Sequence, residues 1–249
     1  MIDTHCHLDS CKAPDAELVK RARSLGVTRI ATVGMDPATN PCALAATAEL
    51  DGVWAIVGRH PNAATGWQAS DIEEIEQAAG QPGVVAVGET GLDFYRDRAP
   101  RKDQLNAFEA QLDLARRLEL PVVIHTRAAE EDTFAVLAEH AQGITVVMHC
   151  FSAPDRLDEC VEAGYLCSLA GNVTYKNADA LQEAARELPD ELLLVETDAP
   201  YLTPVPLRGE PNEPANVTHT AEFVAELRGI DYGELEAIVE RNAKRVFGW

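Results

Sequence analysis

The chain has 249 residues, of which 46% are hydrophobic and 25% charged, a balance that is typical of a folded enzyme and excludes a disordered or fibrous protein. Because 21 Lys and Arg stand against 41 Asp and Glu, the net charge is −20, which excludes extended non-specific binding to duplex DNA. A metal-filled pocket could still receive the end of a strand. The length favours one domain over residues 1–249.

Short apolar runs rich in β-branched residues alternate with longer segments of helical periodicity, and this predicts repeated βα units around a parallel sheet. The predicted strands cover residues 1–5, 27–33, 53–57, 84–87, 122–125, 144–149, 165–168 and 192–196. Helices are predicted at 15–25, 71–79, 101–118, 154–163 and 178–188, and two more at 217–228 and 232–246. Eight such units predict a (β/α)8 TIM barrel, and a doubly wound open sheet is the alternative.

The N-terminus lacks a basic region followed by an apolar stretch, and no apolar run approaches the length of a transmembrane helix. We therefore expect a cytoplasmic protein without membrane contact, monomeric and without an obligate protein partner. The six cysteines show no C-x-x-C spacing, which indicates free thiols and not a disulfide framework or a structural zinc cluster.

The first predicted strand carries His5 and His7, one residue apart. Side chains alternate along a strand, so both imidazoles are expected on one face while Cys6 points to the other. Two imidazoles on one rigid strand form half of a metal site. Without further ligands they could equally be two polar residues at the end of a strand.

Further polar residues lie where the predicted strands end. Barrel enzymes place their chemistry at the C-terminal ends of the strands, so these side chains are expected to converge. Five of the seven histidines occupy such positions, and histidines with purely structural roles would not concentrate at strand ends. The residues at the strand ends are His5, His7, Arg59, His60, Glu89, His125, Arg127, His149, Glu196 and Asp198.

Four imidazoles and two carboxylates suffice for two divalent ions, and such mixed ligands suit Zn²⁺ or Mn²⁺ better than Mg²⁺. We assign the first ion to His5, His7, Glu89 and Asp198. We assign the second ion to His125, His149 and Glu89, which would bridge the two. Such a pair can generate a metal-bound hydroxide, so hydrolysis is the expected reaction, with Asp198 orienting or deprotonating the attacking water.

His60 and Arg127 are candidates to hold an anionic oxygen of the substrate. Arg127 follows His125 by two residues and faces the same side if the strand continues. The alternatives are an ordinary surface ion pair for Arg127 and a turn residue before Pro61 for His60.

Six ordered motifs resemble the signatures of the TatD family of metal-dependent deoxyribonucleases. They are 3–9 (DTHCHLD), 58–61 (GRHP), 88–95 (GETGLDFY), 124–127 (IHTR), 149–151 (HCF) and 196–202 (ETDAPYL), and the likeness continues to 242–247 (NAKRVF). The resemblance implies a TIM barrel of the metal-dependent hydrolase superfamily and a 3′ to 5′ exonuclease on single-stranded DNA. It also implies the ligands His5, His7, Glu89, His125, His149 and Asp198.

Two positions depart from the family pattern. Arg59 stands where a small or aliphatic residue is usual, and it would add a cation beside the pocket. Glu210 lies in a loop that commonly carries more basic residues, so it adds negative charge. The size and charge of the substrate therefore stay open.

Other functions remain as alternatives. A metal-dependent amidohydrolase acting on a small cyclic amide or ester is disfavoured, because Glu89 stands where many such enzymes use a carbamylated lysine. Ester cleavage on aminoacyl-tRNA would use the same hydroxide and is not separated by the sequence. A non-catalytic scaffold would not need six competent ligands. A thiol enzyme built on Cys6 or Cys150 is weaker, because these thiols are expected to face the packed side.

Overall fold

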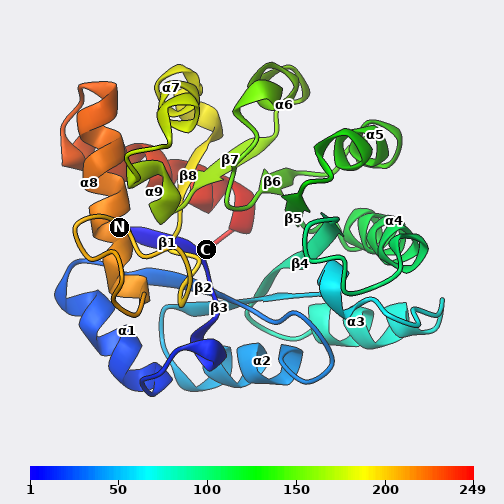
Figure 1. The fold of residues 1–249 in the computed structure, drawn as a ribbon. Coiled ribbons are helices and arrows are strands. Elements are labelled where there is room, and N and C mark those ends of the chain that lie inside the picture. The colour runs from blue at the N-terminus through cyan, green and yellow to red at the C-terminus, as the bar shows by residue number, and fades with distance from the viewer. The chain divides into compact units, whose positions relative to one another are not determined.

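The structure is a computed structural model that describes residues 1–249 (Figure 1). Its strands are β1 (Ile2–Cys6), β2 (Arg29–Val33), β3 (Val53–Val57), β4 (Val84–Asp93), β5 (Val122–Arg127), β6 (Val146–Met148), β7 (Leu166–Leu169) and β8 (Leu193–Val195). Its helices are α1 (Asp15–Ser24), α2 (Asn40–Glu49), α3 (Asp71–Ala79), α4 (Arg101–Leu118), α5 (Glu130–His140), α6 (Leu157–Ala163), α7 (Asp179–Glu187), α8 (Val217–Arg228) and α9 (Tyr232–Phe247).

The strands pair in parallel, and their order in the sheet is the chain order from β1 to β8. A doubly wound sheet reverses its strand order at a switch point, so the observed order excludes that alternative. Strands that alternate with helices in this order define the predicted (β/α)8 fold class, which is confirmed. None of the helices combines the length and the apolar character needed to cross a membrane.

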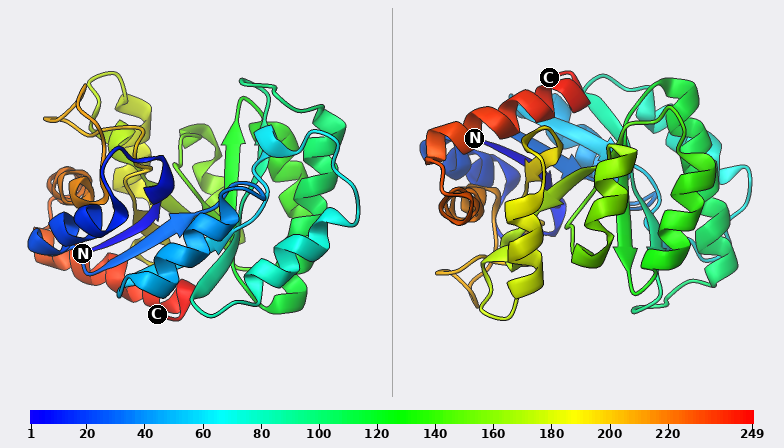
Figure 2. Two further views of the ribbon diagram at one scale, coloured as in Figure 1. Left: turned by 90° about the horizontal axis from the view of Figure 1, so that it is seen from below. Right: turned by 90° about the horizontal axis from the view of Figure 1, so that it is seen from above.

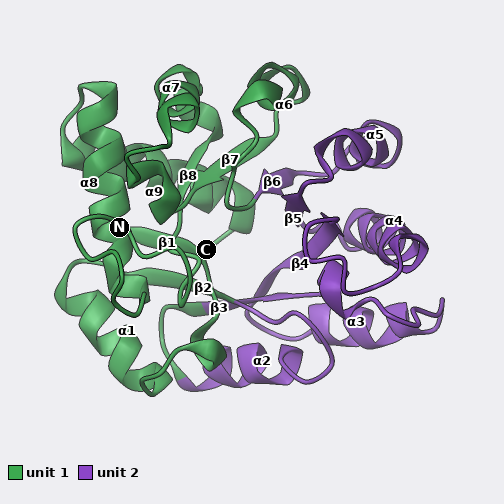
Figure 3. Cartoon of the chain, viewed as in Figure 1, with its two compact units in different colours: residues 1–32, 50–53, 149–249 green, residues 33–49, 54–148 purple.

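The chain divides into two compact units (Figure 3). Unit 1 comprises residues 1–32, 50–53 and 149–249, and unit 2 comprises residues 33–49 and 54–148. The prediction of one domain over residues 1–249 stays a prediction.

In unit 1 the first strand lies beside the last. The hydroxyl of Thr4 donates to the carbonyl of Val195 at 2.9 Å, and Cys6 forms a bridge with Ala199. The amphipathic α9 packs on β1 and β8 (Figure 2). Its first turn is capped by Asp231, whose carboxylate accepts from the backbone N–H of Glu234 at 2.8 Å. The two ends of unit 1 therefore share one core.

In unit 2, side chains of helix α4 bind the backbone at the end of β4 and just after β3. Phe108 and Leu112 lie one turn apart on its inner face and are completely buried, which contributes about 2–3 kcal/mol each. The buried amides of Gln104 and Gln111 lie on the same face. The Gln104 side-chain oxygen accepts from the backbone N–H of Asp93 at 2.9 Å, and that of Gln111 accepts from Arg59 at 2.7 Å.

The element bounds differ from the predicted ones at several places. Strand β4 continues to Asp93 and β5 to Arg127, because these two residues are register partners in the sheet. The predicted helix 154–163 is a 3-10 turn at Pro154–Arg156 followed by α6. No helix was predicted at the positions of α2 and α5. The residues of α2 are rich in alanine, and its polar and apolar residues do not separate onto two faces. Helix α5 begins with three acidic residues.

Candidate metal centre

Three imidazoles meet in unit 1. His5 and His7 project from the end of β1, and their Nε2 atoms lie 3.4 Å apart. The ring of His5 stacks on that of His149, with the centroids 3.7 Å apart. All three residues are buried. Facing imidazole nitrogens at this separation are stable only with a proton or a cation between them, so this grouping fits a metal ion.

Asp198 supplies a negative charge to these histidines from the segment after β8. Its Oδ1 atom lies 3.6 Å from Nε2 of His7 and 4.0 Å from Nε2 of His5. Burial acts to raise the pKa of Asp198, but the hydrogen bond with His7 and the charges of His149, His7 and His5 lower it overall. The carboxylate is therefore ionised and available as a ligand or proton acceptor.

Glu196 is a second carboxylate of this cluster. It is 1% exposed, and its Oε1 atom lies 2.7 Å from Nδ1 of His149 and accepts from the backbone N–H of Cys150 at 2.9 Å. Its other oxygen, Oε2, is buried and has no hydrogen-bond partner. A buried carboxylate oxygen without a partner is costly unless a cation satisfies it, so Glu196 also fits a metal centre.

Asp3 holds the segment after β8 against β1. Its carboxylate accepts from the backbone N–H of Thr197 at 2.8 Å and from the Thr197 hydroxyl at 2.6 Å. Burial raises the pKa of Asp3 to about 8, although the hydrogen bonds from Thr197 oppose this rise. Thr197 lies between Glu196 and Asp198, so Asp3 positions both carboxylates relative to the β1 histidines.

The thiols of unit 1 do not present a nucleophile. Cys6 is completely buried on the opposite face from the histidines, and its Sγ atom donates to the carbonyl of Ala31 at 3.5 Å. Burial raises the pKa of Cys6 well above its usual value and that of Cys150 to about 12. A thiol with such a pKa carries almost no thiolate at neutral pH.

A second cluster lies in unit 2 around Glu89 of β4. Its Oε1 atom lies 2.6 Å from Nδ1 of His125 and 3.5 Å from Nε2 of His60. The rings of His60 and His125 meet edge to face, with the centroids 4.6 Å apart. Glu89 is 2% exposed, so its charge depends on these partners.

His60 is oriented as a donor toward this cluster. Its Nδ1 atom accepts from the backbone N–H of Asn62 at 3.0 Å, so a neutral ring carries its proton on Nε2. Nε2 lies 3.5 Å from Oε1 of Glu89. This tautomer lacks a free lone pair on Nε2 and therefore suits a donor to an anion better than a metal ligand.

Asp93 also belongs to this cluster. Side chains alternate along β4, so Glu89 and Asp93 lie on the same face of the strand. Its Oδ2 atom accepts from the side chain of Asn62 at 2.7 Å and lies 3.4 Å from Nε2 of His125. Burial acts to raise the pKa of Asp93, but hydrogen bonds from His125, the backbone N–H of Arg96 and Asn62 lower it overall. Asp93 is therefore an ionised partner of His125.

Gly91 allows β4 to approach His125 closely. Its φ is 134°, and a Cβ atom there would lie 2.0 Å from the carbonyl oxygen of His125. Only glycine fits this position.

Within each unit, groups of His, Cys, Asp and Glu side chains offer ligand atoms that all lie within 4.8 Å of one another. Mixed imidazole and carboxylate donors of this kind suit Zn²⁺ or Mn²⁺. The groups are His5, His149 and Glu196, then His149, Cys150 and Asp198, both in unit 1, and His60, Glu89 and His125 in unit 2.

The structure thus brings the predicted residues His5, His7, His149 and Asp198 together in unit 1, and His60, Glu89 and His125 together in unit 2. The roles predicted for them, including Glu89 as a bridge, stay predictions. Arg127 ends β5, where its guanidinium lies 4.2 Å above the ring of Tyr95. Arg59 contacts Trp67 and lies 3.9 Å from Glu74, so its charge already has a partner.

Glu196 and Asp93 had no predicted role. A signal for both existed, because each lies an even number of residues from an assigned ligand on the same segment, namely Asp198 and Glu89.

Eight parallel strands alternating with helices, with buried histidine and carboxylate clusters where strands end, define a metal-dependent hydrolase of the barrel class. More narrowly, the chain belongs to the TatD family, because the model of TatD related DNase matches residues 2–248.

Individual relatives agree with this assignment. The chain is 38% identical to the uncharacterized metal-dependent hydrolase YabD of Bacillus subtilis, covering 99% of this chain and 98% of the relative. It is 35% identical to the 3′-5′ ssDNA/RNA exonuclease TatD of Erwinia tasmaniensis, covering 99% of each. The crystal structure of YjjV, a TatD homologue from Escherichia coli K12, matches with a TM-score of 0.92 and 29% identity, over 100% of this chain and 98% of that one.

Proposed function

We propose that this hydrolase is a divalent-metal-dependent deoxyribonuclease that removes nucleotides from the 3′ end of single-stranded DNA. The observation that carries the proposal is the set of buried imidazoles and carboxylates in a chain of the TatD family. The relative from Erwinia tasmaniensis, named as an exonuclease on single-stranded DNA and RNA, supports the class of substrate.

Two divalent ions, Zn²⁺, Mn²⁺ or Mg²⁺, are the proposed cofactors. When bound, they would activate water and neutralise charge on the phosphodiester. The proposed ligands are His5, His7, Glu89, His125, His149 and Asp198. Two observations support a metal ion at these residues: the facing Nε2 atoms of His5 and His7, and the buried Oε2 of Glu196, which has no hydrogen-bond partner.

Three further side-chain roles are proposed for the reaction. Asp198, whose lowered pKa keeps it ionised, is the proposed group that orients the attacking water and accepts its proton. The Nε2–H of His60 can donate to a non-bridging phosphate oxygen, because Asn62 occupies its other nitrogen. Arg127 can place a cation beside the same anion.

The test is a gel time course on 5′-labelled single-stranded DNA with metal-stripped protein, to which Mg²⁺, Mn²⁺ or Zn²⁺ is restored. A metal-dependent ladder that shortens from the 3′ end is expected. His149→Ala should abolish it. His140→Ala is the matched control, because His140 ends α5, its side chain is 30% exposed and it belongs to neither cluster.

DNA that stays intact while metal analysis shows a filled site would overturn the proposal. Aminoacyl-tRNA and small cyclic amides or esters would then be the substrates to assay, since the same centre could cleave an ester or amide bond. A single-stranded RNA run in parallel separates a deoxyribonuclease from an enzyme that accepts both nucleic acids.

A further inference from the structure

Tyr95 is an aromatic residue that unit 2 leaves in solvent. It lies in the loop after β4, two residues beyond Asp93, and 65% of it is exposed. Its hydroxyl makes no hydrogen bond within the protein, whereas its backbone N–H donates to Asp93. The hydrogen bond to Asp93 therefore holds the backbone of Tyr95 in place, and the exposed ring does not pack in the hydrophobic core. One exposed tyrosine is ordinary, so its surroundings decide whether it has a role.

Arg127 lies against this ring. Its Cζ atom is 4.2 Å from the ring centroid, within the range of a cation–π contact. The backbone of Arg127 is fixed, because its carbonyl accepts from the N–H of Phe94 at 3.0 Å. Arg127 therefore covers one face of Tyr95, and the exposed fraction of the residue leaves the other face open.

The guanidinium of Arg127 has no carboxylate partner, although the chain has 41 acidic residues against 21 basic ones. Arg96 and Arg98 follow Tyr95 in the loop and form no ion pair either, whereas Asp97 between them pairs with Arg101. A ligand that carries both planar rings and negative charge would match the exposed ring of Tyr95 and the cation of Arg127.

Asp93 connects this loop to the candidate metal ligands. Its Oδ1 atom accepts from the backbone N–H of Tyr95 at 3.0 Å and of Arg96 at 2.7 Å. Its Oδ2 atom lies 3.4 Å from Nε2 of His125. One carboxylate therefore sets the position of the loop relative to His125, so a strand lying on the loop would present its phosphate near that histidine.

We infer that Tyr95, backed by Arg127, is a stacking platform for a base of a single-stranded nucleic acid, and that Arg127 contacts its phosphates. This inference rests on the proposed nuclease function and adds a subsite to it. Stacking on an aromatic ring accepts every base, and it requires a base that is free of its duplex partner. The platform therefore favours single strands of any sequence over duplex DNA.

The experiment compares Tyr95→Leu, Tyr95→Phe and Arg127→Met in the metal-loaded enzyme. Three quantities are measured: cleavage of a single-stranded oligonucleotide, binding of its cleavage-resistant phosphorothioate analogue, and hydrolysis of methyl p-nitrophenyl phosphate, a diester without a base. Arg241→Met is the matched control, because Arg241 is exposed on α9 and forms no ion pair.

Tyr95→Leu should raise the KM and the Kd for the single strand about tenfold, which corresponds to about 1.4 kcal/mol. Tyr95→Phe should behave as the wild type, because it keeps the ring. Arg127→Met should weaken binding and reduce its salt dependence. Hydrolysis of the small diester should change in neither Tyr95 variant, whereas it should fall in Arg127→Met, because Arg127 is also proposed to lie beside the reacting phosphate. Arg241→Met should change nothing.

The platform is overturned if Tyr95→Leu binds and cleaves the single strand as the wild type does, or if hydrolysis of the small diester falls equally. A wild-type enzyme that binds the analogue but cleaves no DNA would overturn the nuclease proposal alone, provided that Tyr95→Leu still weakens binding. A wild-type enzyme that neither binds nor cleaves single strands would overturn both.

Discussion

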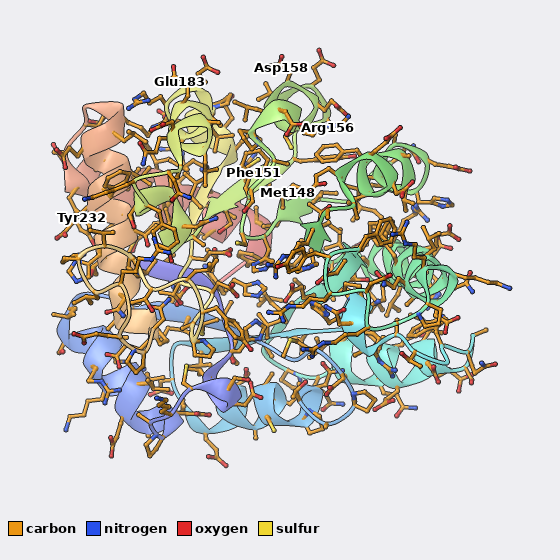
Figure 4. The ribbon with its side chains drawn as sticks, in the orientation of Figure 1. Met148, Phe151, Arg156, Asp158, Glu183 and Tyr232 are labelled. Carbon is orange, nitrogen blue, oxygen red and sulfur yellow. The ribbon has the colours of Figure 1, made fainter.

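Nδ1 of His149 lies 2.7 Å from Oε1 of Glu196, an ion-pair contact that lacks the geometry of a hydrogen bond and leaves Nε2 for a metal ion. Glu196→Gln removes the charge and should lower the metal affinity about 10- to 100-fold. Competition with a chromogenic chelator measures this change. Glu183→Gln is the matched control, because Glu183 is exposed on α7 and pairs only with Arg186 (Figure 4). Equal affinities of the two variants would contradict the role of Glu196.

Asp198→Asn should reduce kcat by about 10²- to 10⁴-fold at full metal occupancy, because an amide cannot accept a proton from water. The side-chain oxygen can still lie near His7, so the protein should remain folded. Initial rates at saturating substrate, with the metal content of each sample determined, measure this effect. A kcat within about twofold of the wild type would remove Asp198 from the proposed proton transfer.

Thr197→Val should destabilise the fold by about 1–3 kcal/mol, since the buried Asp3 carboxylate loses a donor and the Ala199 N–H loses an acceptor. Thr220→Val makes the same change of atoms on α8, where the buried hydroxyl has no hydrogen-bond partner, and it should be neutral or stabilising. Urea denaturation gives both free energies of unfolding. Similar losses in the two variants would show that the Asp3 contact has no special effect.

Gly91→Ala should disturb the junction of β4 and β5, because the new Cβ would lie 2.0 Å from the carbonyl oxygen of His125. Gly66→Ala is the control: Gly66 also has a positive φ, 74°, but no atom lies within 4 Å of its Cβ position. The control should cost about 1 kcal/mol of backbone strain, and Gly91→Ala clearly more than that. Thermal unfolding and metal binding of both variants measure the difference.

Tyr232→Phe should change how stability depends on pH. Burial raises the pKa of Tyr232 to about 12, and the charges of Glu236 and Glu222 add to this rise. Because the pKa is higher in the folded state, the phenol contributes stability below about pH 10, and this contribution is lost as the pH rises toward 12. Free energies of unfolding measured at pH 9 and pH 11 should therefore differ less in Tyr232→Phe than in the wild type.

Strand ends with histidines could be predicted because their signals are local. The alternation of β1 places His5 and His7 on one face, and the alternation of apolar runs with helical segments predicts the fold. Strand β4 was predicted too short, because pairing with β5 determines its continuation from Gly88 to Asp93. Gly88 and Gly91 also interrupt the run of apolar residues that indicates a strand.

The fold class and the family could be predicted from the sequence, but the membership of each cluster could not. His149 was predicted to share an ion with His125, whereas in the structure its ring stacks on that of His5. Only the tertiary structure decided that Glu196 supports His149, that Asp93 links His125 to the loop of Tyr95, and that Arg127 covers the ring of Tyr95. The contacts of Glu196 with His149, of Asp93 with His125 and of Arg127 with Tyr95 each join residues from different elements of the chain. Periodicity fixes only the face on which a side chain lies, and the packing of one element against another fixes which atoms it meets.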